Sequence, residues 1–134
     1  MKTILFACVH NAGRSQMAAA LFNKLADPRQ ARAISAGTDP VPRVHPEVAA
    51  AMREIGIELE GVTPQQLTPE LAAQAQVLVT MGCGDKCPLV PGARVEDWPL
   101  QDPKGQALQV VRAIRKDIER RVQDLILRER AAPV

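Results

Sequence analysis

The sequence has little net charge, no long apolar run and no internal repeat. It holds 17 Lys and Arg against 15 Asp and Glu, and the resulting net charge of +2 is too small to indicate nucleic acid or a membrane as a partner. No apolar run is long enough for a transmembrane helix. The first residues lead directly into a predicted strand, so no signal peptide is expected. These absences favour a cytoplasmic protein.

The composition is that of an ordinary globular domain. The chain has 134 residues, of which 46% are hydrophobic and 24% charged, so it can bury a core without disulfides or a structural metal. Since it contains no linker, we expect one domain over residues 1–134, and a monomer. In a reducing cytosol its three cysteines are better explained by catalysis or redox chemistry than by structure, and the odd number supports this.

Apolar stretches and helical patterns alternate along the chain. We predict strands at 3–7, 31–36, 76–81 and 94–98, and helices at 15–25, 46–55, 68–74 and 106–128. This alternation predicts an α/β fold, a three-layer sandwich whose four-stranded parallel sheet is flanked by helices. The loops that follow the first, third and fourth strands should then open at the same edge of the sheet, where such folds bind ligands.

The loop between the first strand and the first helix has the features of an oxyanion site. It runs CVHNAGRS over residues 8–15. Backbone N–H groups and the N-terminus of the following helix would face a bound anion, and Arg14 would grip two of its oxygens. The same positive field favours the thiolate of Cys8, and Gly13 allows a tight turn beside the ligand. The alternative is a buried structural cysteine followed by a helix N-cap.

A second candidate site holds two cysteines in a glycine-containing loop. Cys83 and Cys87 could form a disulfide if the loop brings their Cα atoms close enough. Half of a zinc site is a weaker alternative, since only His10 and His45 remain as further ligands. Packing of one cysteine in the core is a third possibility. A redox pair is favoured over both, because a nucleophilic cysteine is predicted at the same sheet edge.

A third candidate site is the acidic segment after the fourth strand. A carboxyl group placed over the anion loop could protonate a leaving oxygen, and Asp102 has the position for it. The alternative for Asp102 is a turn residue before the final helix. Glu96 and Asp97 are rivals, although they lie in or beside the predicted strand.

Together these segments resemble a known family. CVHNAGRSQMA, MGCGDKCP and EDWPLQDPKG, in this order, resemble the arsenate reductases with the low-molecular-weight protein tyrosine phosphatase fold, in the branch linked to thioredoxin or mycothiol. The resemblance covers essentially the whole chain. It implies that Cys8 is the nucleophile, that Arg14 binds and stabilises arsenate, and that Asp102 is the general acid. The residues it implies for substrate binding are Cys8, Asn11, Ala12, Gly13, Arg14 and Ser15, with Asn11 shaping the loop and Ser15 bonding the thiolate.

The resemblance further implies a relay of three cysteines. Cys83 would attack the Cys8–arsenate adduct, and Cys87 would then take over the disulfide for an external reductant. No bound cofactor and no metal are expected. The presence of Cys87 favours thioredoxin as the reductant, whereas the compact loop also resembles mycothiol-linked relatives. Ala19 replaces a glutamate that helps some relatives to bind potassium, so potassium activation is not expected.

Two other functions share parts of this pattern. A low-molecular-weight protein tyrosine phosphatase would use Cys8, Arg14 and Asp102, but the chain has no tyrosine to wall an aryl phosphate site, and Lys104 follows the acid. A non-enzymatic arsenic sensor could bind arsenite through the three thiols, although it would need neither Arg14 nor Asp102. Loss of turnover in a Cys83→Ser variant separates the reductase from the phosphatase.

Overall fold

The protein is built on a parallel sheet, as the sequence predicts. The computed structural model describes residues 1–82 and 92–131, without the side chains of residues 130 and 131. Its four strands lie in the order β2-β1-β3-β4, and every neighbouring pair is parallel. Their bounds are β1 (Lys2–Cys8), β2 (Ala31–Gly37), β3 (Val77–Thr80) and β4 (Arg94–Asp97).

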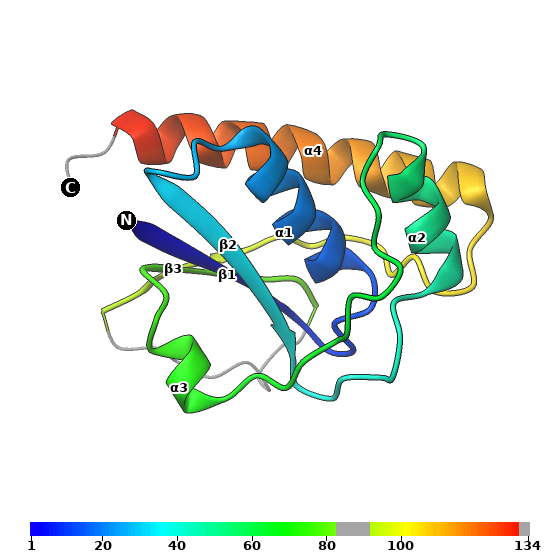
Figure 1. The fold of residues 1–134 in the computed structure, drawn as a ribbon, viewed down its shortest axis with the longest axis horizontal. Coiled ribbons are helices and arrows are strands. Elements are labelled where there is room, and N and C mark those ends of the chain that lie inside the picture. Colours follow the sequence, from blue (N-terminus) through cyan, green and yellow to red (C-terminus); the bar gives the residue numbers. More distant parts are fainter. Residues whose placement is uncertain (83–91, 132–134) are drawn as a thin grey trace.

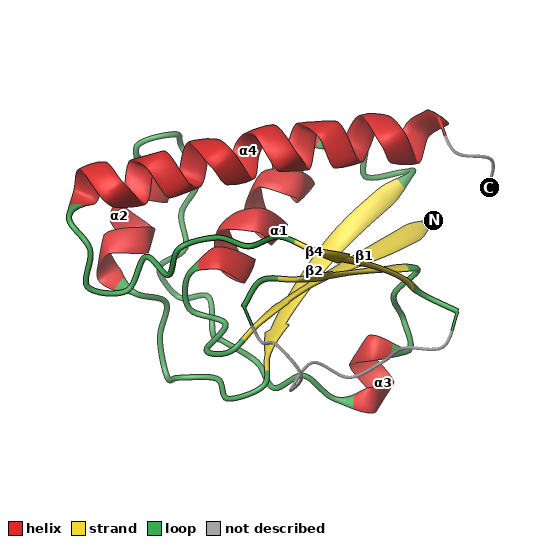
Figure 2. Ribbon diagram, turned by 180° about the vertical axis from the view of Figure 1, so that it is seen from behind, coloured by secondary structure: helices red, strands yellow, loops and turns green. Residues whose placement is uncertain are grey.

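Helices cover both faces of the sheet and complete a three-layer α/β sandwich. Their bounds are α1 (Arg14–Leu25), α2 (Pro46–Arg53), α3 (Pro69–Ala72) and α4 (Leu108–Ala131). Helices α1, α2 and α4 lie on one face, and α3 lies on the other (Figures 1 and 2). The predicted fold class is therefore confirmed.

The central strand β1 divides the core in two. Its apolar residues run continuously, which is typical of a strand buried on both faces. Ile4, Phe6 and Cys8 pack in the large cluster beneath α1, α2 and α4, whereas Leu5 and Ala7 pack in the smaller cluster with α3. Because Cys8 is the last residue of this buried strand, its position is fixed by the sheet.

The helix boundaries follow local chemistry. Pro46 and Pro69 begin α2 and α3, where a missing N–H costs no helical bond. Thr68 is the N-cap of α3, with Oγ1 accepting from Leu71 N at 3.1 Å. Helix α2 ends at Arg53, two residues before the predicted end, and a turn follows in which Gly56 has a φ of +81°.

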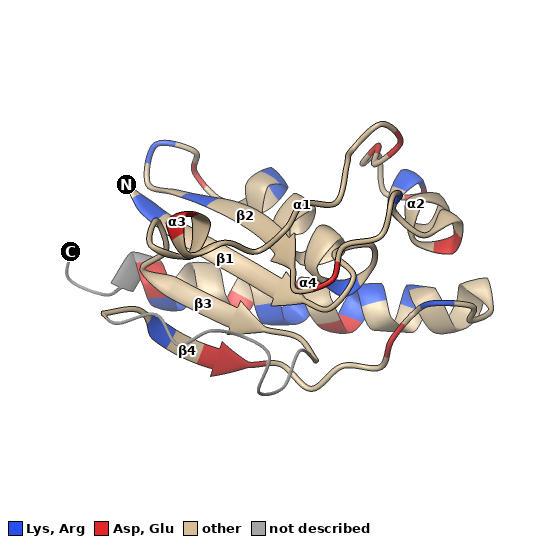
Figure 3. Ribbon diagram, turned by 90° about the horizontal axis from the view of Figure 1, so that it is seen from below, with Lys and Arg blue, Asp and Glu red and all other residues tan. Residues whose placement is uncertain are grey.

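Helix α4 has one apolar and one charged face. Its predicted apolar residues are buried or half-buried against the large cluster: Leu108, Val111, Ile114, Ile118, Val122 and Leu125. The charged residues gather along α4 and the neighbouring edge strand β4 (Figure 3). Among the described residues, no helix combines the length and apolar character needed to cross a membrane.

Candidate active site

Three loops meet at the carboxyl edge of the sheet, as the topology predicts. In Figure 3 the strands point the same way, so the first residues after β1, β3 and β4 lie at one end of the sheet. The side chain of Arg14 joins these loops. Its Nη1 donates to the carbonyl of Leu100 at 3.0 Å, its Nη2 lies 3.9 Å from Asp102 Oδ2, and its guanidinium lies against Gly82. Arg14 thus links the first loop to the segments after β3 and β4.

The anion loop presents unpaired backbone N–H groups. It lies between Cys8, at the end of β1, and Arg14, the first residue of α1. Within the described part of the chain, the N–H groups of residues 11–16 donate to no backbone carbonyl, and the first such bond of the helix start is Met17 N to Gly13 O. Free N–H groups at a helix N-terminus attract an anion. The loop can therefore hold an oxyanion next to the thiol of Cys8.

Asn11 fixes the shape of this loop. It has a φ of +52°, the left-handed conformation that asparagine tolerates better than most residues. Its Oδ1 accepts from Gln65 N at 2.9 Å and from Gln16 Nε2 at 3.2 Å, so the amide orientation is set by two donors. Its Nδ2 must then face the other way, and it donates to Ser15 Oγ at 2.8 Å.

Ser15 connects Asn11 to Cys8 through hydrogen bonds of its hydroxyl group. Ser15 and Cys8 are both buried, and Ser15 Oγ lies 2.8 Å from Cys8 Sγ. Because Ser15 Oγ already accepts a hydrogen bond from Asn11 Nδ2, its own hydroxyl proton is free to point at the sulfur. A hydroxyl that donates to sulfur stabilises a thiolate more than a thiol. The chain Asn11–Ser15–Cys8 therefore suits a nucleophilic sulfur.

Two glycines allow the loop to pack closely against its surroundings. A Cβ atom at Gly37 would lie 2.5 Å from the carbonyl oxygen of Val9, so the end of β2 can touch the loop only without a side chain. A Cβ atom at Gly13 would lie 2.9 Å from Pro103 Cγ and 3.5 Å from His45 Cδ2. Pro103 follows Asp102 directly, so its contact with Gly13 holds the acidic segment over the anion loop.

Of the three acids considered from the sequence, Asp102 is the one beside Arg14. Its side chain is 49% exposed, and Oδ1 accepts from Lys104 N at 3.0 Å. Asp97 instead accepts from the Thr80 hydroxyl at 2.7 Å. Glu96 binds Arg94 and Arg128 beside α4. Asp102 therefore has the position for proton transfer at the anion loop.

Glu96 is also unsuited to carry a proton at neutral pH. Burial alone would raise the pKa of Glu96, but hydrogen bonds from Arg128, Arg94 and Trp98 outweigh burial and lower it. A carboxyl group with a lowered pKa stays ionised and holds these cations in place. Glu96 thus serves the contact between β4 and α4.

His45 packs against the anion loop. Its position in the sequence, directly before a helix, does not indicate this contact. The backbone N–H of His45 donates to the carbonyl of Ala12 at 2.9 Å, and its imidazole ring lies beside Gly13. Burial lowers the pKa of His45, outweighing Glu47 and Asp102, which raise it. A neutral imidazole therefore lies behind the loop.

Sequence reasoning missed two further residues of the site. Gln65 orients Asn11 from a segment far away in the chain, and Gly82 makes room for Arg14. Neither residue belongs to a motif with the Cys8 loop, so only the tertiary contacts reveal them. Of the predicted residues, Arg14 and Asp102 lie 3.9 Å apart, and Cys8 contacts Ser15, which follows Arg14 in the chain.

Cys83 and Cys87 lie outside the described residues, so the predicted redox pair stays a prediction. Met81 and Gly82, which precede Cys83, are held at the same edge by a bond from Met81 N to Ala7 O of 2.8 Å. Among the residues that are described, no group of three or more His, Cys, Asp or Glu side chains could hold a metal ion.

Sequence comparison assigns nearly the whole chain to one family. Residues 3–132 match the family described as low molecular weight phosphotyrosine protein phosphatase. A putative arsenate reductase of Halobacterium salinarum is 39% identical over 90% of this chain and 87% of its own length. A glutaredoxin arsenate reductase of Synechocystis is 37% identical over 94% of this chain and 97% of its own length.

A comparison of structures gives the same result. The thioredoxin-dependent arsenate reductase of Corynebacterium glutamicum superposes with a TM-score of 0.84 and 35% identity, covering 97% of this chain. The present chain spans 62% of that protein's length.

Proposed function

The chain belongs to the low molecular weight phosphotyrosine protein phosphatase family, and from this premise we propose that it reduces arsenate to arsenite. The observation that carries the proposal is the buried contact between Ser15 Oγ and Cys8 Sγ. It lies in the loop that ends at Arg14, the first residue of α1. Two relatives that match nearly the whole chain are described as arsenate reductases, which selects this activity within the family.

In the first step the Cys8 thiolate attacks the arsenic of arsenate bound in the anion loop. Arg14 and the free backbone N–H groups stabilise the negative oxygens. Asp102 gives its proton to the departing oxygen, which leaves as water. A Cys8–arsenate adduct remains, in which arsenic is still pentavalent.

In the second step Cys83 attacks the sulfur of Cys8. A Cys8–Cys83 disulfide forms, the sulfur–arsenic bond breaks, and its electron pair stays on arsenic, which leaves as trivalent arsenite. Cys87 then attacks Cys83 and releases the thiolate of Cys8, so that the disulfide joins Cys83 and Cys87. The transfer from Cys8–Cys83 to Cys83–Cys87 is ordinary thiol–disulfide exchange.

Thioredoxin is the proposed reductant, which places the protein in the cytoplasm. The similar protein of Corynebacterium glutamicum is described as a thioredoxin-dependent arsenate reductase, whereas the Synechocystis relative is described as a glutaredoxin arsenate reductase. A third cysteine favours thioredoxin, because reduction by a small thiol such as mycothiol through a mixed disulfide needs only two. The protein carries no bound cofactor or metal in this scheme.

The test is arsenate-dependent consumption of NADPH with thioredoxin and thioredoxin reductase. The proposal expects sustained consumption by the purified protein and its loss in Cys8→Ser, Cys83→Ser and Cys87→Ser. A matched control is Ser35→Ala, because Ser35 is buried on β2 outside the site and should leave turnover unchanged.

The other outcomes separate the alternatives. Turnover only with mycothiol, or with glutathione and glutaredoxin, would keep the reductase and change its partner. Hydrolysis of an aryl phosphate without arsenate turnover by any donor would replace the proposal with a phosphatase. Stoichiometric arsenite binding without turnover would indicate a sensor.

A further inference from the structure

The guanidinium of Arg14 is held by groups outside its own loop. The side chain of Arg14 is only 13% exposed, and Nη1 donates to the Leu100 carbonyl at 3.0 Å. A long side chain with this much rotational freedom needs such contacts to stay in one place. What holds Arg14 therefore decides where its charge lies in the site.

Gly82 also lies directly against the guanidinium of Arg14. A Cβ atom at position 82 would lie 2.6 Å from Nη1, 3.2 Å from Cζ and 3.3 Å from Nη2 of Arg14. All three distances are shorter than an ordinary contact between carbon and a neighbouring heavy atom. The guanidinium therefore occupies the space that a side chain at position 82 would need, with Nη1 the nearest atom.

The backbone at Gly82 has little freedom to yield to a side chain. Met81, the preceding residue, is fully buried and its N–H is bonded to Ala7 O of the central strand at 2.8 Å. The Arg14 side chain, in contrast, ends in a flexible group that can rotate away. A methyl group at position 82 would consequently displace the guanidinium and not the sheet.

We propose that Gly82 is a positioning residue, which keeps the Arg14 guanidinium between the anion loop and the Leu100 carbonyl, and so sets the affinity of the site for a tetrahedral oxyanion. This inference rests on the proposed function only in assuming that Arg14 binds the oxyanion. It also explains why a glycine directly precedes Cys83.

The test compares Gly82→Ala with a glycine of equal strain but no neighbour. Gly82 has a φ of +96° and Gly61 a φ of +88°, and a Cβ atom at Gly61 would meet nothing within 4 Å. Both substitutions therefore place a side chain at a similar positive φ, while only the first reaches Arg14. The readout is the dissociation constant for inorganic phosphate of the fully reduced protein, measured by titration calorimetry, with the melting temperature alongside.

The expected result is a selective loss of affinity. Gly82→Ala should weaken phosphate binding roughly 10- to 100-fold, the range for losing hydrogen bonds to a charged group. Gly61→Ala should leave the dissociation constant unchanged, although both variants lower the melting temperature. Equal phosphate affinity in the two variants would overturn the inference.

A second pair of variants shows whether the effect passes through Arg14. In an Arg14→Lys background the fork that lies against Gly82 is gone, so adding Gly82→Ala should change the dissociation constant by less than about twofold. A full additional loss in that background would also overturn the inference. A wild-type protein that binds phosphate but turns over no arsenate would contradict the proposed function alone, because the phosphate measurement does not depend on reduction.

Discussion

At the scale of single residues, the site depends on which atom holds each proton. Gln65 N and Gln16 Nε2 set the orientation of the Asn11 amide, this amide donates to Ser15 Oγ, and Ser15 Oγ lies 2.8 Å from Cys8 Sγ. Asn11, Ser15 and Cys8 are all buried, and between buried groups hydrogen bonds are strong and their loss is costly. The reactivity of Cys8 is therefore controlled from outside the loop.

Ser15→Ala should slow the alkylation of Cys8. The substitution removes a hydrogen bond to the thiolate, so alkylation by iodoacetamide at pH 7 should become about 10-fold slower. The measurement uses a Cys83→Ser, Cys87→Ser background, in which Cys8 is the remaining thiol. Ser35→Ala in the same background is the control, and equal rates in both variants would refute this role of Ser15.

Asp102→Asn should lower turnover without weakening anion binding. Asparagine keeps the acceptor for Lys104 N but has no acidic proton, so kcat for arsenate should fall by about 10² to 10⁴. The phosphate dissociation constant should stay within about threefold of the wild type, because asparagine has nearly the same size and its amide can still donate a hydrogen bond to an anion oxygen. Asp97→Asn, whose partner is Thr80, is the matched control. A kcat that drops equally in both variants would argue against Asp102 as the acid.

The residues of the site could be predicted only where they share a local segment. Cys8, Arg14 and Ser15 lie within one loop, and Asp102 lies in a short segment after a strand, so spacing and chemistry suffice to single them out. Gln65, His45 and Gly82 reach the site through tertiary contacts. Gly82 lies in a motif singled out for its cysteines, but neither that motif nor the sequence around Gln65 and His45 indicates a contact with the Cys8 loop or with Arg14.

At the scale of elements, an ionic clamp fixes α2 against α4. Arg112 Nε lies 3.0 Å from Glu54 Oε1, and Arg115 Nη1 lies 2.8 Å from the same oxygen and 2.6 Å from Ala51 O. Arg115 is buried, so it depends on these partners. Since α2 begins directly after His45, this clamp also supports the wall behind the anion loop.

Glu54→Gln should remove part of the acid sensitivity of the fold. Hydrogen bonds from Arg112 and Arg115 lower the pKa of Glu54 from 4.5 to about 2. A lowered pKa stabilises the folded state fully above pH 4.5, and this contribution is lost as the pH falls toward about 2. Urea unfolding should therefore show the wild type to be more stable than the variant at pH 7, with the difference shrinking below pH 4.5.

Glu58→Gln is the matched control for this clamp. Its partner Arg53 likewise lowers the pKa of Glu58 to about 2, but both side chains are more than half exposed and joined within one turn of the chain. Solvent screens such a pair, so the free energy of unfolding should change less than in Glu54→Gln. Equal losses in the two variants would show that joining α2 to α4 adds nothing to the pair.

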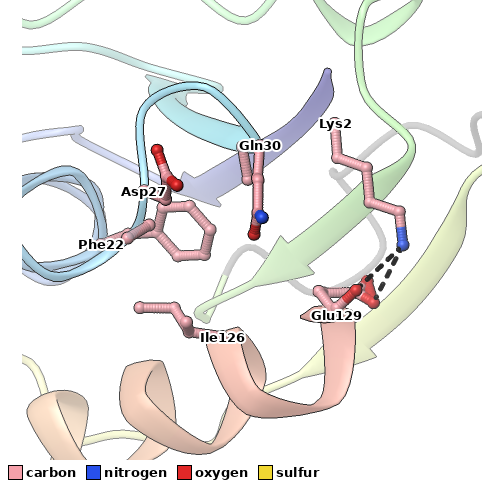
Figure 4. A pocket seen from close by; sticks show the side chains of 8 residues that line it. Lys2, Phe22, Asp27, Gln30, Ile126 and Glu129 are labelled. Carbon is pink, nitrogen blue, oxygen red and sulfur yellow. Dashed lines mark hydrogen bonds and ion pairs between the residues drawn. The ribbon is translucent and has the colours of Figure 1, made fainter. Parts of the chain in front are cut away.

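At the scale of the whole molecule, buried charges join the edge of the sheet to the end of α4. Glu129 is only 5% exposed in its side chain, and it contacts Arg94 at 2.8 Å and Lys2 at 3.7 Å. Lys2 and Glu129 lie next to Phe22 and Ile126 at a cavity of about 30 Å³ (Figure 4). Strands β1 and β4 are thus held to the same helix.

Glu129→Gln should destabilise the fold by about 1–3 kcal/mol at neutral pH, because two cations lose a buried charged partner. Urea unfolding measures the change. Asp124→Asn on the same helix is the control, since Asp124 is 68% exposed and pairs with Arg128 only at the surface. Its loss should stay below about 1 kcal/mol. If Glu129→Gln unfolds at the same urea concentration as the control, the buried network contributes no stability.

The overall architecture was predictable to a greater extent than its cross-links. The continuous apolar run of β1 and the stripe on α4 indicate buried elements by periodicity alone, and both are buried as predicted. The partners of Glu129 and Glu54 could not be predicted, because a charged residue on a helix is usually only solvated. Helix α2 ends two residues before the predicted Ile55, because the backbone turns over residues 54–56 with local bonds from Ile55 N to Met52 O and from Gly56 N to Arg53 O.

The contact between Lys2 and Glu129 spans 127 positions of the chain, and this has a consequence for synthesis on the ribosome. The loop with Cys8 is translated early, whereas α4, which covers α1, is translated late. Until α4 leaves the exit tunnel, the nascent chain exposes the apolar side of α1 to solvent and to chaperones. Helix α1 therefore gains its full packing partner only after most of the chain has been translated.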